Sequence, residues 1–462
     1  MITNKIKNLT FLRLPINEKI NFINFSFAVL FLFFLPLNQK LLPPLIVLWI
    51  LSFIVEVVFF KNKRERLEKE RKILLIIPVL FFLSNAVGFF YSNNKTASFL
   101  NIQTTLSLFI FPLIFIFSNE LYKKNGKVLL SVFVIGNVVP AIICLVLSFS
   151  NSINFIDGKI IFNTAIRPEF ANKSFFYQVT IRVSEFSYMY LSRFIHPSYF
   201  ALYLNIGIVI LYYLYRQALN NKEKIVYIIG IVFFYSIIYL LASRAGLLSL
   251  FVTLIVLTII ELKLNKHYIL ILLFSFTLNF GLYKAMTQGQ IKTNITQVQQ
   301  EIKKIHQKQE TKNIEQEQKQ KPVIQKEQQD ARLIIWKYAL LAIKENVIFG
   351  VGNGDMRNTM CEKYIESGYE DGLELKLDPH NQYLTTMLSG GIFSLILLLL
   401  MLGWGFLYSI KTKRYVFSFF IAIFSFNILV ESMLTTIAGV AFFAFFFSFL
   451  TIYTPTCFKK TK

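Results

Sequence analysis

Cysteine is scarce in this chain of 462 residues, and its three copies are far apart. Cys144 falls in an apolar run, Cys361 in a polar loop and Cys457 near the end of the chain. None of them has a partner at the spacing of a metal site. We therefore expect no metal site built on cysteine.

Acidic residues are also few, with 26 Asp and Glu against 48 Lys and Arg, which leaves a formal net charge of +22. Such a balance is typical of proteins that bind nucleic acid. Here, however, the basic residues stand in short clusters between apolar runs, which is where membrane proteins retain their positive charge. We therefore predict that the chain does not bind nucleic acid.

A dinucleotide-binding loop is missing as well, although Gly350, Gly352 and Gly354 follow one another closely. A Rossmann fingerprint needs a preceding strand, a following helix and a second glycine spacing, and none of these is present. We predict that these glycines form turns. The acidic run from Asp355 to Asp378 has no metal-ligand spacing, so we interpret it as a solvated face.

Apolar residues are abundant, because 55% of the chain is hydrophobic and 50 residues are Phe. Runs of about bilayer length recur along the chain and predict an all-α, polytopic membrane protein of about twelve transmembrane helices. A large helical loop stands before the third-last span. The predicted spans are 22–37, 42–60, 73–91, 99–118, 127–150, 198–215, 225–242, 246–260, 268–283, 382–407, 415–430 and 434–453.

The distribution of Lys and Arg predicts the orientation of these spans. With the N-terminus inside, the inner segments hold 25 Lys and Arg and the short outer loops hold three. The positive-inside rule then places both ends in the cytoplasm and the long loops 151–197 and 284–381 outside. The first span lacks a small-residue cleavage site, so we expect it to be uncleaved. The three cysteines would lie in the membrane, outside and in the cytoplasm, which predicts no intramolecular disulfide.

Residues 288–330 form a low-complexity insertion rich in Gln, Lys and Glu. Apolar residues recur in it at the heptad spacing of a short amphipathic helix or a weak coiled coil, and the rest is too polar to pack. We assign this insertion no chemistry. The heptad positions are Ile291, Ile295, Val298, Ile302 and Ile305.

A helical pattern that begins at Arg332 follows the insertion. Leu333, Trp336, Leu340 and Ile343 make one apolar face of it, so we expect this helix to lie along the outer membrane surface. The whole stretch 330–391 is predicted to cap the membrane domain.

Three residues at the outer face could carry chemistry together. They are Arg244 in a tight turn between spans, Arg332 at the start of the surface helix and His380 just before a span. Arginine is suited to bidentate recognition of phosphate, and histidine is a natural general base near neutral pH. Together they predict a reaction on a phosphate-bearing lipid, in which the arginines hold the phosphate while His380 deprotonates an acceptor hydroxyl.

The end of the first long loop carries a second set of polar residues, Arg193, His196 and Tyr199, directly before a span. A His-Pro pair at a membrane edge is typical of an interfacial anchor, and Tyr199 suits the aromatic belt. Contact with the substrate is the alternative, and the sequence leaves both open.

Several motifs in order resemble the bacterial O-antigen ligase and polymerase family. They are Ser243-Arg-Ala-Gly-Leu-Leu248, Arg332-Leu-Ile-Ile-Trp336, Phe349-Gly-Val-Gly-Asn-Gly354, His380-Asn-Gln-Tyr-Leu384, Gly390-Gly-Ile392 and Asn427-Ile-Leu-Val-Glu-Ser432. The resemblance covers residues 242 to about 449. It divides the chain into an N-terminal transmembrane bundle (1–241) with its loop 151–197, a ligase-like region (242–453) with the insertion 288–330 and the loop 331–381, and a tail (454–462).

This resemblance implies a GT-C-like enzyme of the bacterial inner membrane, with its active site on the periplasmic side. The implied reaction is an inverting glycosyl transfer, without metal or cofactor, from an undecaprenyl-pyrophosphate-linked glycan to an acceptor. By resemblance, Arg244 and Arg332 would bind the pyrophosphate, His380 would act on the acceptor hydroxyl and Glu431 would orient the site. The acceptor is lipid A-core in ligases and another repeat unit in polymerases.

Other functions stay open at this stage. Within the family, the residues do not separate a ligase from a polymerase or from a protein O-oligosaccharyltransferase. A transporter of lipids or polysaccharides would favour charges in the middle of spans and internal repeats, and we find no clear repeat. A non-catalytic scaffold of the cell envelope would tolerate substitution of His380.

Overall fold

The computed structural model describes residues 15–59, 67–117, 119–156, 158–264 and 331–453. The predicted span 268–283, the insertion 288–330, Cys457 and the tail 454–462 lie outside these residues. Cys144 and Cys361 are both free.

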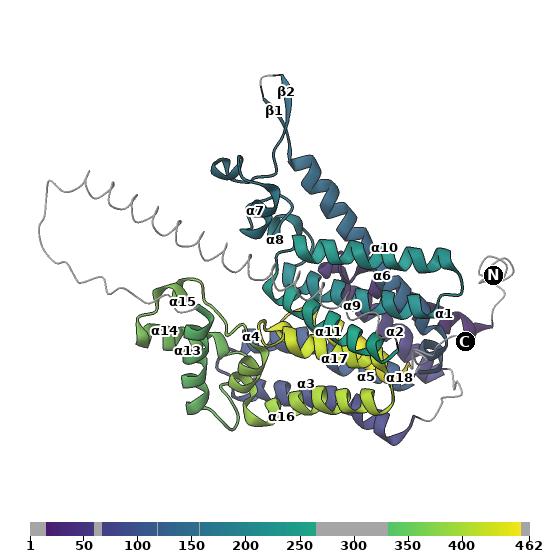
Figure 1. Cartoon of the computed structure of the whole chain (residues 1–462). Coiled ribbons are helices and arrows are strands. Elements are labelled where there is room, and N and C mark those ends of the chain that lie inside the picture. Colours follow the sequence, from purple (N-terminus) through teal and green to yellow (C-terminus); the bar gives the residue numbers. More distant parts are fainter. Residues whose placement is uncertain (1–14, 60–66, 118, 157, 265–330, 454–462) are drawn as a thin grey trace, which may run out of the picture.

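The described chain is almost entirely helical (Figure 1). Eight of its helical segments are long and apolar enough to cross a membrane, and three further apolar helices are shorter. The all-α, polytopic membrane architecture is therefore confirmed, whereas the count of twelve spans is not. The helices are α1 (Ile16–Phe34), α2 (Leu42–Phe59), α3 (Lys69–Tyr91), α4 (Lys95–Thr105), α5 (Ser107–Phe117), α6 (Asn119–Asn151), α7 (Phe175–Thr180), α8 (Tyr188–Leu191), α9 (Pro197–Gln217), α10 (Asn221–Leu240), α11 (Arg244–Leu264), α13 (Ala331–Glu345), α14 (Met356–Ser367), α15 (Glu370–Glu374), α16 (Gln382–Lys411), α17 (Tyr415–Asn427) and α18 (Ile437–Ile452).

Phenylalanine forms the centre of the bundle. Helix α18 is buried from Ala438 to Ile452, and its Phe442, Phe445 and Phe446 contact rings from six other helices. Phe115 of α5 and Phe133 of α6 are among these neighbours and are fully buried. Aromatic pairs at such centroid distances stabilise a core beyond the area that they bury. The high Phe content therefore serves packing between helices as well as contact with lipid.

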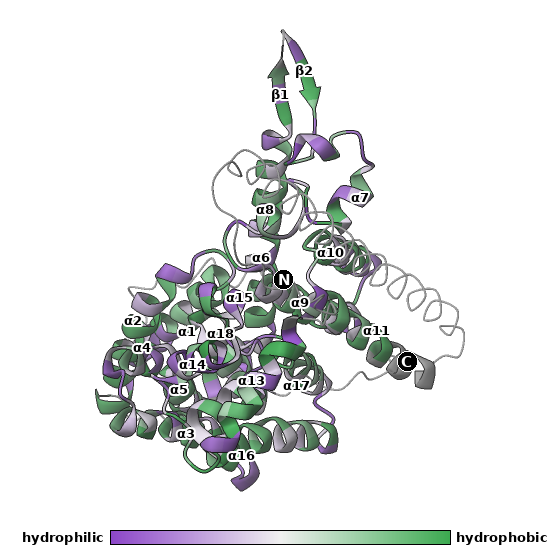
Figure 2. Cartoon of the chain, turned by 90° about the vertical axis from the view of Figure 1, so that its left-hand side faces the viewer, coloured by the Kyte–Doolittle hydropathy of each residue, from purple (hydrophilic) through white to green (hydrophobic). Residues whose placement is uncertain are grey.

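A small β-hairpin is the one pair of strands in the described chain. Strands β1 (Ile153–Ile156) and β2 (Lys159–Phe162) pair antiparallel directly after α6. The hairpin extends away from the helices, and its Phe155 and Ile160 are largely exposed (Figure 2). Helix α6 has 33 residues, about 50 Å at the rise of an α-helix, which exceeds the roughly 30 Å of a bilayer core. Its length carries the hairpin away from the bundle.

The two ends of the bundle differ in chemistry. At one end, Lys411 pairs with Glu70, and the buried Arg414 donates to the carbonyls of Leu450 and Thr451. Helices α13, α14 and α15 lie at the other end (Figure 1). The Lys411–Arg414 cluster and the cap thus lie at opposite ends of the described bundle, and the predicted orientation in the membrane stays a prediction.

Helices α13 to α15 form a small cap with its own core, which packs against the start of α16. The buried side of α13 consists of Ile335, Ala339, Ala342 and Ile343. Of the predicted membrane-facing residues, Leu333 and Leu340 are exposed, whereas Ile343 is buried within the cap. Those two leucines face away from the protein, on the side available to a membrane surface.

The segment Gly350–Gly354, which we call the glycine segment, connects this cap to α16 through hydrogen bonds. Gly350 and Gly352 have positive φ, of 69° and 92°, which confirms that they form turns. The amides of Val351 and Gly352 donate to the carbonyls of Leu388 and Ser389, where α16 is broken at Gly391. A Cβ on Gly391 would stand 2.1 Å from the carbonyl oxygen of Ile348. Only glycine allows the two segments to approach this closely.

The end of the glycine segment holds the start of α4. The carboxylate of Asp355 accepts from the amides of Asn93 and Asn94, which precede the first turn of α4. The backbone amide of Gly354 donates to Ser92 Oγ, and Asn353 accepts from Ser98. The residues from Gly350 to Asp355 therefore fix the cap, the break in α16 and the α3–α4 corner relative to one another.

Candidate active site

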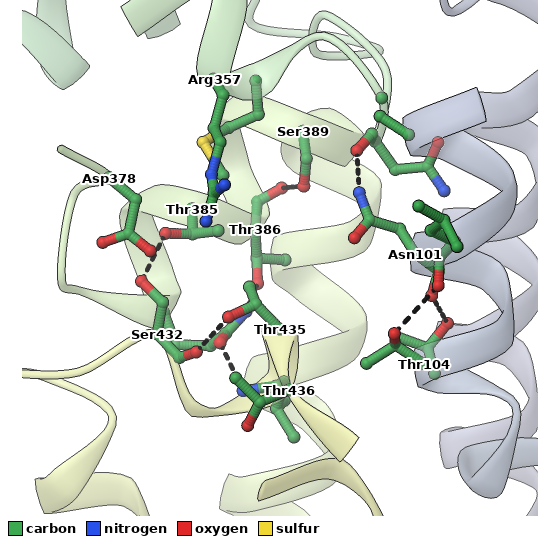
Figure 3. Close-up of a pocket in the computed structure, with 18 of the residues that line it drawn as sticks. Asn101, Thr104, Arg357, Asp378, Thr385, Thr386, Ser389, Ser432, Thr435 and Thr436 are labelled. Atoms are coloured by element: carbon green, nitrogen blue, oxygen red, sulfur yellow. Dashed lines mark hydrogen bonds between the residues drawn. The ribbon is translucent and has the colours of Figure 1, made fainter. Parts of the chain in front are cut away.

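A cavity of about 940 Å³ opens among the cap, the corner between α3 and α4, and the starts of α9 and α16. Most of the residues that line it have polar side chains, several of which Figure 3 labels. His196, Tyr199, His380 and Glu431, four of the residues singled out from the sequence, line it. The structure thus brings together residues that are up to 235 positions apart in the chain.

His380 occupies the short loop before α16. Its backbone amide donates to Asp378 Oδ1 at 2.9 Å, which forms an Asx-turn over Asp378-Pro379-His380. This turn holds His380 at a φ of +44°, a conformation that a non-glycine residue rarely adopts. Strain of this kind is often found at functional sites, where the surrounding contacts enforce it. The side chain is 37% exposed and lines the cavity.

Two carboxylates face the imidazole of His380. Its Nδ1 lies 3.4 Å from Glu431 Oε2 and 3.4 Å from Asp378 Oδ1, both long for a hydrogen bond. With two carboxylate oxygens as neighbours, Nδ1 is the nitrogen that carries the proton, and Nε2 is left as the basic atom. The hydrogen bond to Glu431 raises the pKa of His380, and burial and the charge of Arg332 oppose this only in part.

Glu431 is held between two helices, in the connection from α17 to α18. Its Oε1 accepts from Ser198 Oγ of α9 at 3.3 Å, while Oε2 faces His380. Burial would raise the pKa of this carboxyl, but the hydrogen bond from His380 and the charges of His380 and Arg332 outweigh burial and lower it. Glu431 is therefore an ionised carboxylate that can orient His380 and stabilise its protonated form.

His196 and Tyr199 form the neighbouring part of the wall. His196 is the N-cap of α9, and its Nδ1 accepts from the amide of Ser198 at 3.3 Å. Burial lowers the pKa of His196, so this imidazole is neutral near pH 7. His196 therefore fixes the first turn of α9, from which Ser198 reaches Glu431 and Tyr199 reaches the cavity.

Arg332 and Arg244, the two arginines predicted to hold phosphate, are not among the residues that line the cavity. Arg332 is close enough to His380 and Glu431 to lower the pKa of both. The guanidinium of Arg244 acts in the same way on a third arginine, Arg182. The charge of Arg332 therefore reaches the His380–Glu431 pair, and Arg332 and Arg244 both act on Arg182.

Arg182 was not expected from the sequence. It is largely buried, its Nε and Nη2 donate to the carbonyl of Ala242 at 3.1 and 2.6 Å, and it stacks on the ring of Tyr188 at 3.9 Å. Burial, with the charges of Arg244 and Arg332, lowers its pKa to about 10. Arg182 remains charged near pH 7 and holds the turn that precedes Arg244.

Arg193, by contrast, does not line the cavity. Its Nη2 pairs with Glu185 Oε2 at 2.8 Å on the outside of the same loop. Both partners of this ion pair are partly exposed. Arg193 therefore forms an ion pair within the loop. The substrate contact predicted for it is not seen at the described cavity.

Two further cations were also missed. Arg357 and Lys376 line the cavity from the cap, and Figure 3 shows Arg357 pointing from α14 toward Thr385. In the sequence both stand within the acidic run and look like its counter-charges. The signal for Arg357 was its place three residues after the glycine segment, which the structure uses to position it.

These features define a class: a polytopic helical membrane protein with a polar cavity at one end of its bundle, in which a His–carboxylate pair lies beside several arginines. The comparison with protein families then gives the resemblance. The family model described as O-antigen ligase matches residues 229–399, and the chain resembles that family over this region. The matched region contains Arg244, Arg332 and His380. No match to the chain is found among curated proteins.

Proposed function

We propose that this protein is a glycosyltransferase that moves a glycan from undecaprenyl pyrophosphate to an acceptor hydroxyl. The observation that carries the proposal is the His380–Glu431 pair, which lines the cavity together with Arg357 and Lys376 and is reached by the charge of Arg332. The family match supports a membrane glycosyltransferase but does not distinguish its acceptor. We propose lipid A-core as the acceptor, which makes the protein an O-antigen ligase.

The reaction starts with His380. Its Nε2 takes the proton from the acceptor hydroxyl while that oxygen attacks the anomeric carbon of the donor. The bond between the anomeric carbon and the phosphate oxygen breaks, and the undecaprenyl pyrophosphate leaves with the electron pair. A single displacement of this kind inverts the anomeric configuration. Glu431 stabilises the imidazolium that forms, as a carboxylate does beside a catalytic histidine.

The arginines stabilise the leaving group. Negative charge develops on the pyrophosphate as the bond breaks. Guanidinium groups that are already fixed in position stabilise this charge without having to reorient during the reaction. Arg182 is held by Ala242 and Tyr188, so its charge is oriented in advance. These cations supply the positive charge that the reaction needs, and we propose that it proceeds without a metal.

The decisive experiment is to delete the gene for this protein in its own organism. Lipopolysaccharide from the deletion strain is separated on a gel, and the lipid-linked glycan is measured in parallel. Core-only lipopolysaccharide with glycan left on the carrier supports a ligase. Core with a single repeat unit supports the polymerase alternative, and an unchanged ladder overturns both.

The role of His380 is tested in the same strain. We expect the His380→Ala variant, expressed at the level of the wild type, to restore no glycan transfer, because the base is missing. Lys413→Ala, at the opposite end of the bundle, is the matched control and should restore the ladder. Full activity of His380→Ala would remove the catalytic assignment.

A further inference from the structure

One wall of the cavity has a chemistry that the His380–Glu431 pair does not use. It consists of Asn85 from α3 and Asn101, Thr104 and Thr105 from α4, and we call these four residues the amide–hydroxyl wall. Figure 3 shows Asn101 and Thr104 across the cavity from Asp378 and Ser432. Among the described residues that line the cavity, those from α3 and α4 carry no charge.

All four side chains use a hydrogen-bond donor within the protein. Asn85 Nδ2 donates to the carbonyl of Phe81 at 2.8 Å, and Asn101 Nδ2 donates to the carbonyl of Asn353. The hydroxyls of Thr104 and Thr105 donate to carbonyls of their own helix at 2.9 and 2.8 Å. Each side chain retains an oxygen with free lone pairs, and each Asn has a second N–H. The wall is therefore neutral and richer in acceptors than in donors.

Such a set discriminates between the parts of a lipid-linked glycan. Phosphate oxygens are acceptors themselves and carry negative charge, and this wall offers them no cation and no hydroxyl donor. Sugar hydroxyls are donors and are uncharged, so they fit it. The cavity thus separates a cationic side, with Arg357 and Lys376, from a side that accepts hydrogen bonds.

We propose that the amide–hydroxyl wall is a glycan subsite, which binds sugar hydroxyls next to the bond that is cleaved. This inference rests on the proposed function for the identity of the glycan. All four residues precede the region 229–399 that matches the family. The part of the chain that selects the sugar therefore lies apart from the part that carries His380, so the sugar selected can differ between proteins that share the catalytic half.

Thr104 and Thr105 allow a clean test. Their hydroxyls bond only to carbonyls of α4 among the described contacts, so a change to valine keeps the side-chain shape and the tertiary hydrogen bonds. The test compares the double variant Thr104→Val/Thr105→Val with Thr96→Val, a matched control that is exposed on α4 and outside the cavity. Thermal unfolding of the purified proteins shows whether the fold is retained.

The probe is the free glycan released by mild acid from the lipid-linked pool of the same organism. Its affinity for the purified protein in detergent is measured by calorimetry. We expect the wild type and Thr96→Val to bind it alike. The double variant should bind at least about tenfold more weakly, because two hydrogen bonds are lost. Binding of inorganic pyrophosphate should not change in the double variant.

The outcomes separate this inference from the proposed function. Equal affinity of the double variant and the wild type, or no binding of glycan to the wild type, overturns the subsite. Glycan binding that is lost in the double variant, in a protein whose deletion leaves the lipopolysaccharide ladder unchanged, supports the subsite and overturns the transferase. Active transfer with equal glycan affinity supports the transferase alone.

Discussion

Trp336 of α13 donates its indole N–H to the backbone carbonyl of Pro379 at 2.9 Å. Pro379 immediately precedes His380, so this bond ties the cap helix to the strained turn that presents the imidazole. Helix α13 begins at Ala331, and Arg332 therefore stands one helical turn before Trp336. The same helix sets the position of a cation and of the proposed base.

The indole hydrogen bond predicts a positioning role for Trp336. In Trp336→Phe the ring remains but the donor is lost, so His380 is held less firmly. We expect the rate of glycan transfer at saturating donor to fall by about tenfold, with little change in the KM for the donor. Trp404→Phe, at the opposite end of α16, is the control and should keep the wild-type rate. An unchanged rate in Trp336→Phe would contradict the role.

The pair His380–Glu431 predicts a pH profile. The pKa of His380 is raised above 6.5, so the imidazole is protonated and inactive as a base below that raised pKa. The kcat/KM for the donor should therefore fall as the pH drops, and the midpoint of this fall should lie above ~6.5. In Glu431→Gln the largest cause of the upward shift is lost, so the midpoint should move to lower pH. A midpoint that stays in place in Glu431→Gln would show that Glu431 does not act on His380.

Two arginines of the same loop should behave differently. Arg182 is largely buried, stacked and bonded to the turn before Arg244, whereas Arg193 forms a partly exposed ion pair. We expect Arg182→Ala to lower kcat/KM by about 10² to 10³, the scale seen for one preorganised donor. Arg193→Ala should stay within about threefold of the wild type, since such ion pairs contribute little. Equal effects of the two changes would refute the distinction.

Two glycines of α16 provide a matched pair for stability. Gly391 has φ 67° and ψ −166°, a region nearly exclusive to glycine, and a Cβ there meets the backbone of Ile348. We expect Gly391→Ala to destabilise the protein by about 3 kcal/mol or more. At Gly403 no atom lies within 4 Å of an added Cβ, so Gly403→Ala should change stability by less than about 1 kcal/mol. Thermal unfolding in detergent measures both. Similar midpoints would show that the approach at Gly391 is not required.

The proposed orientation can be tested by labelling. Glu374→Cys in the cap and Lys222→Cys at the start of α10 are introduced separately into a variant whose three native cysteines are changed to alanine. Both positions are exposed. We expect an impermeant maleimide to label Glu374→Cys in intact spheroplasts, and Lys222→Cys only after the membrane is permeabilised. The reverse pattern would invert the topology and place the active site in the cytoplasm.

The helical bundle was readable from the sequence because each buried or lipid-facing helix needs a long apolar run. The limits of that signal are seen at α4. Asn101, Thr104 and Thr105 fall at the start of the predicted span 99–118, where their neighbours are apolar. The structure ends α4 at Thr105 and begins α5 at Ser107, so the polar part of this run is a separate helix that lines the cavity. Hydropathy averages such a segment into the span beside it.

The site was readable where the chain itself marks a boundary. His380 and Glu431 stand next to the ends of apolar runs, so their common face follows from counting spans. Arg182 has no such marker, because its partner Ala242 is 60 residues away and its place depends on a left-handed turn with φ of 63°. Arg357 was missed for another reason. It stands in an acidic run with other cations, and the sequence does not show which of these cations faces a cavity.

The glycine segment has a consequence for exchanging parts between related proteins. It holds the corner between α3 and α4 on one side and the break in α16 on the other. A chimera that takes residues 229–399 from a relative would therefore separate Asp355 from the amides of Asn93 and Asn94 that it was matched to. A donor fragment should carry its own α3–α4 corner, and with it the wall that we propose selects the sugar.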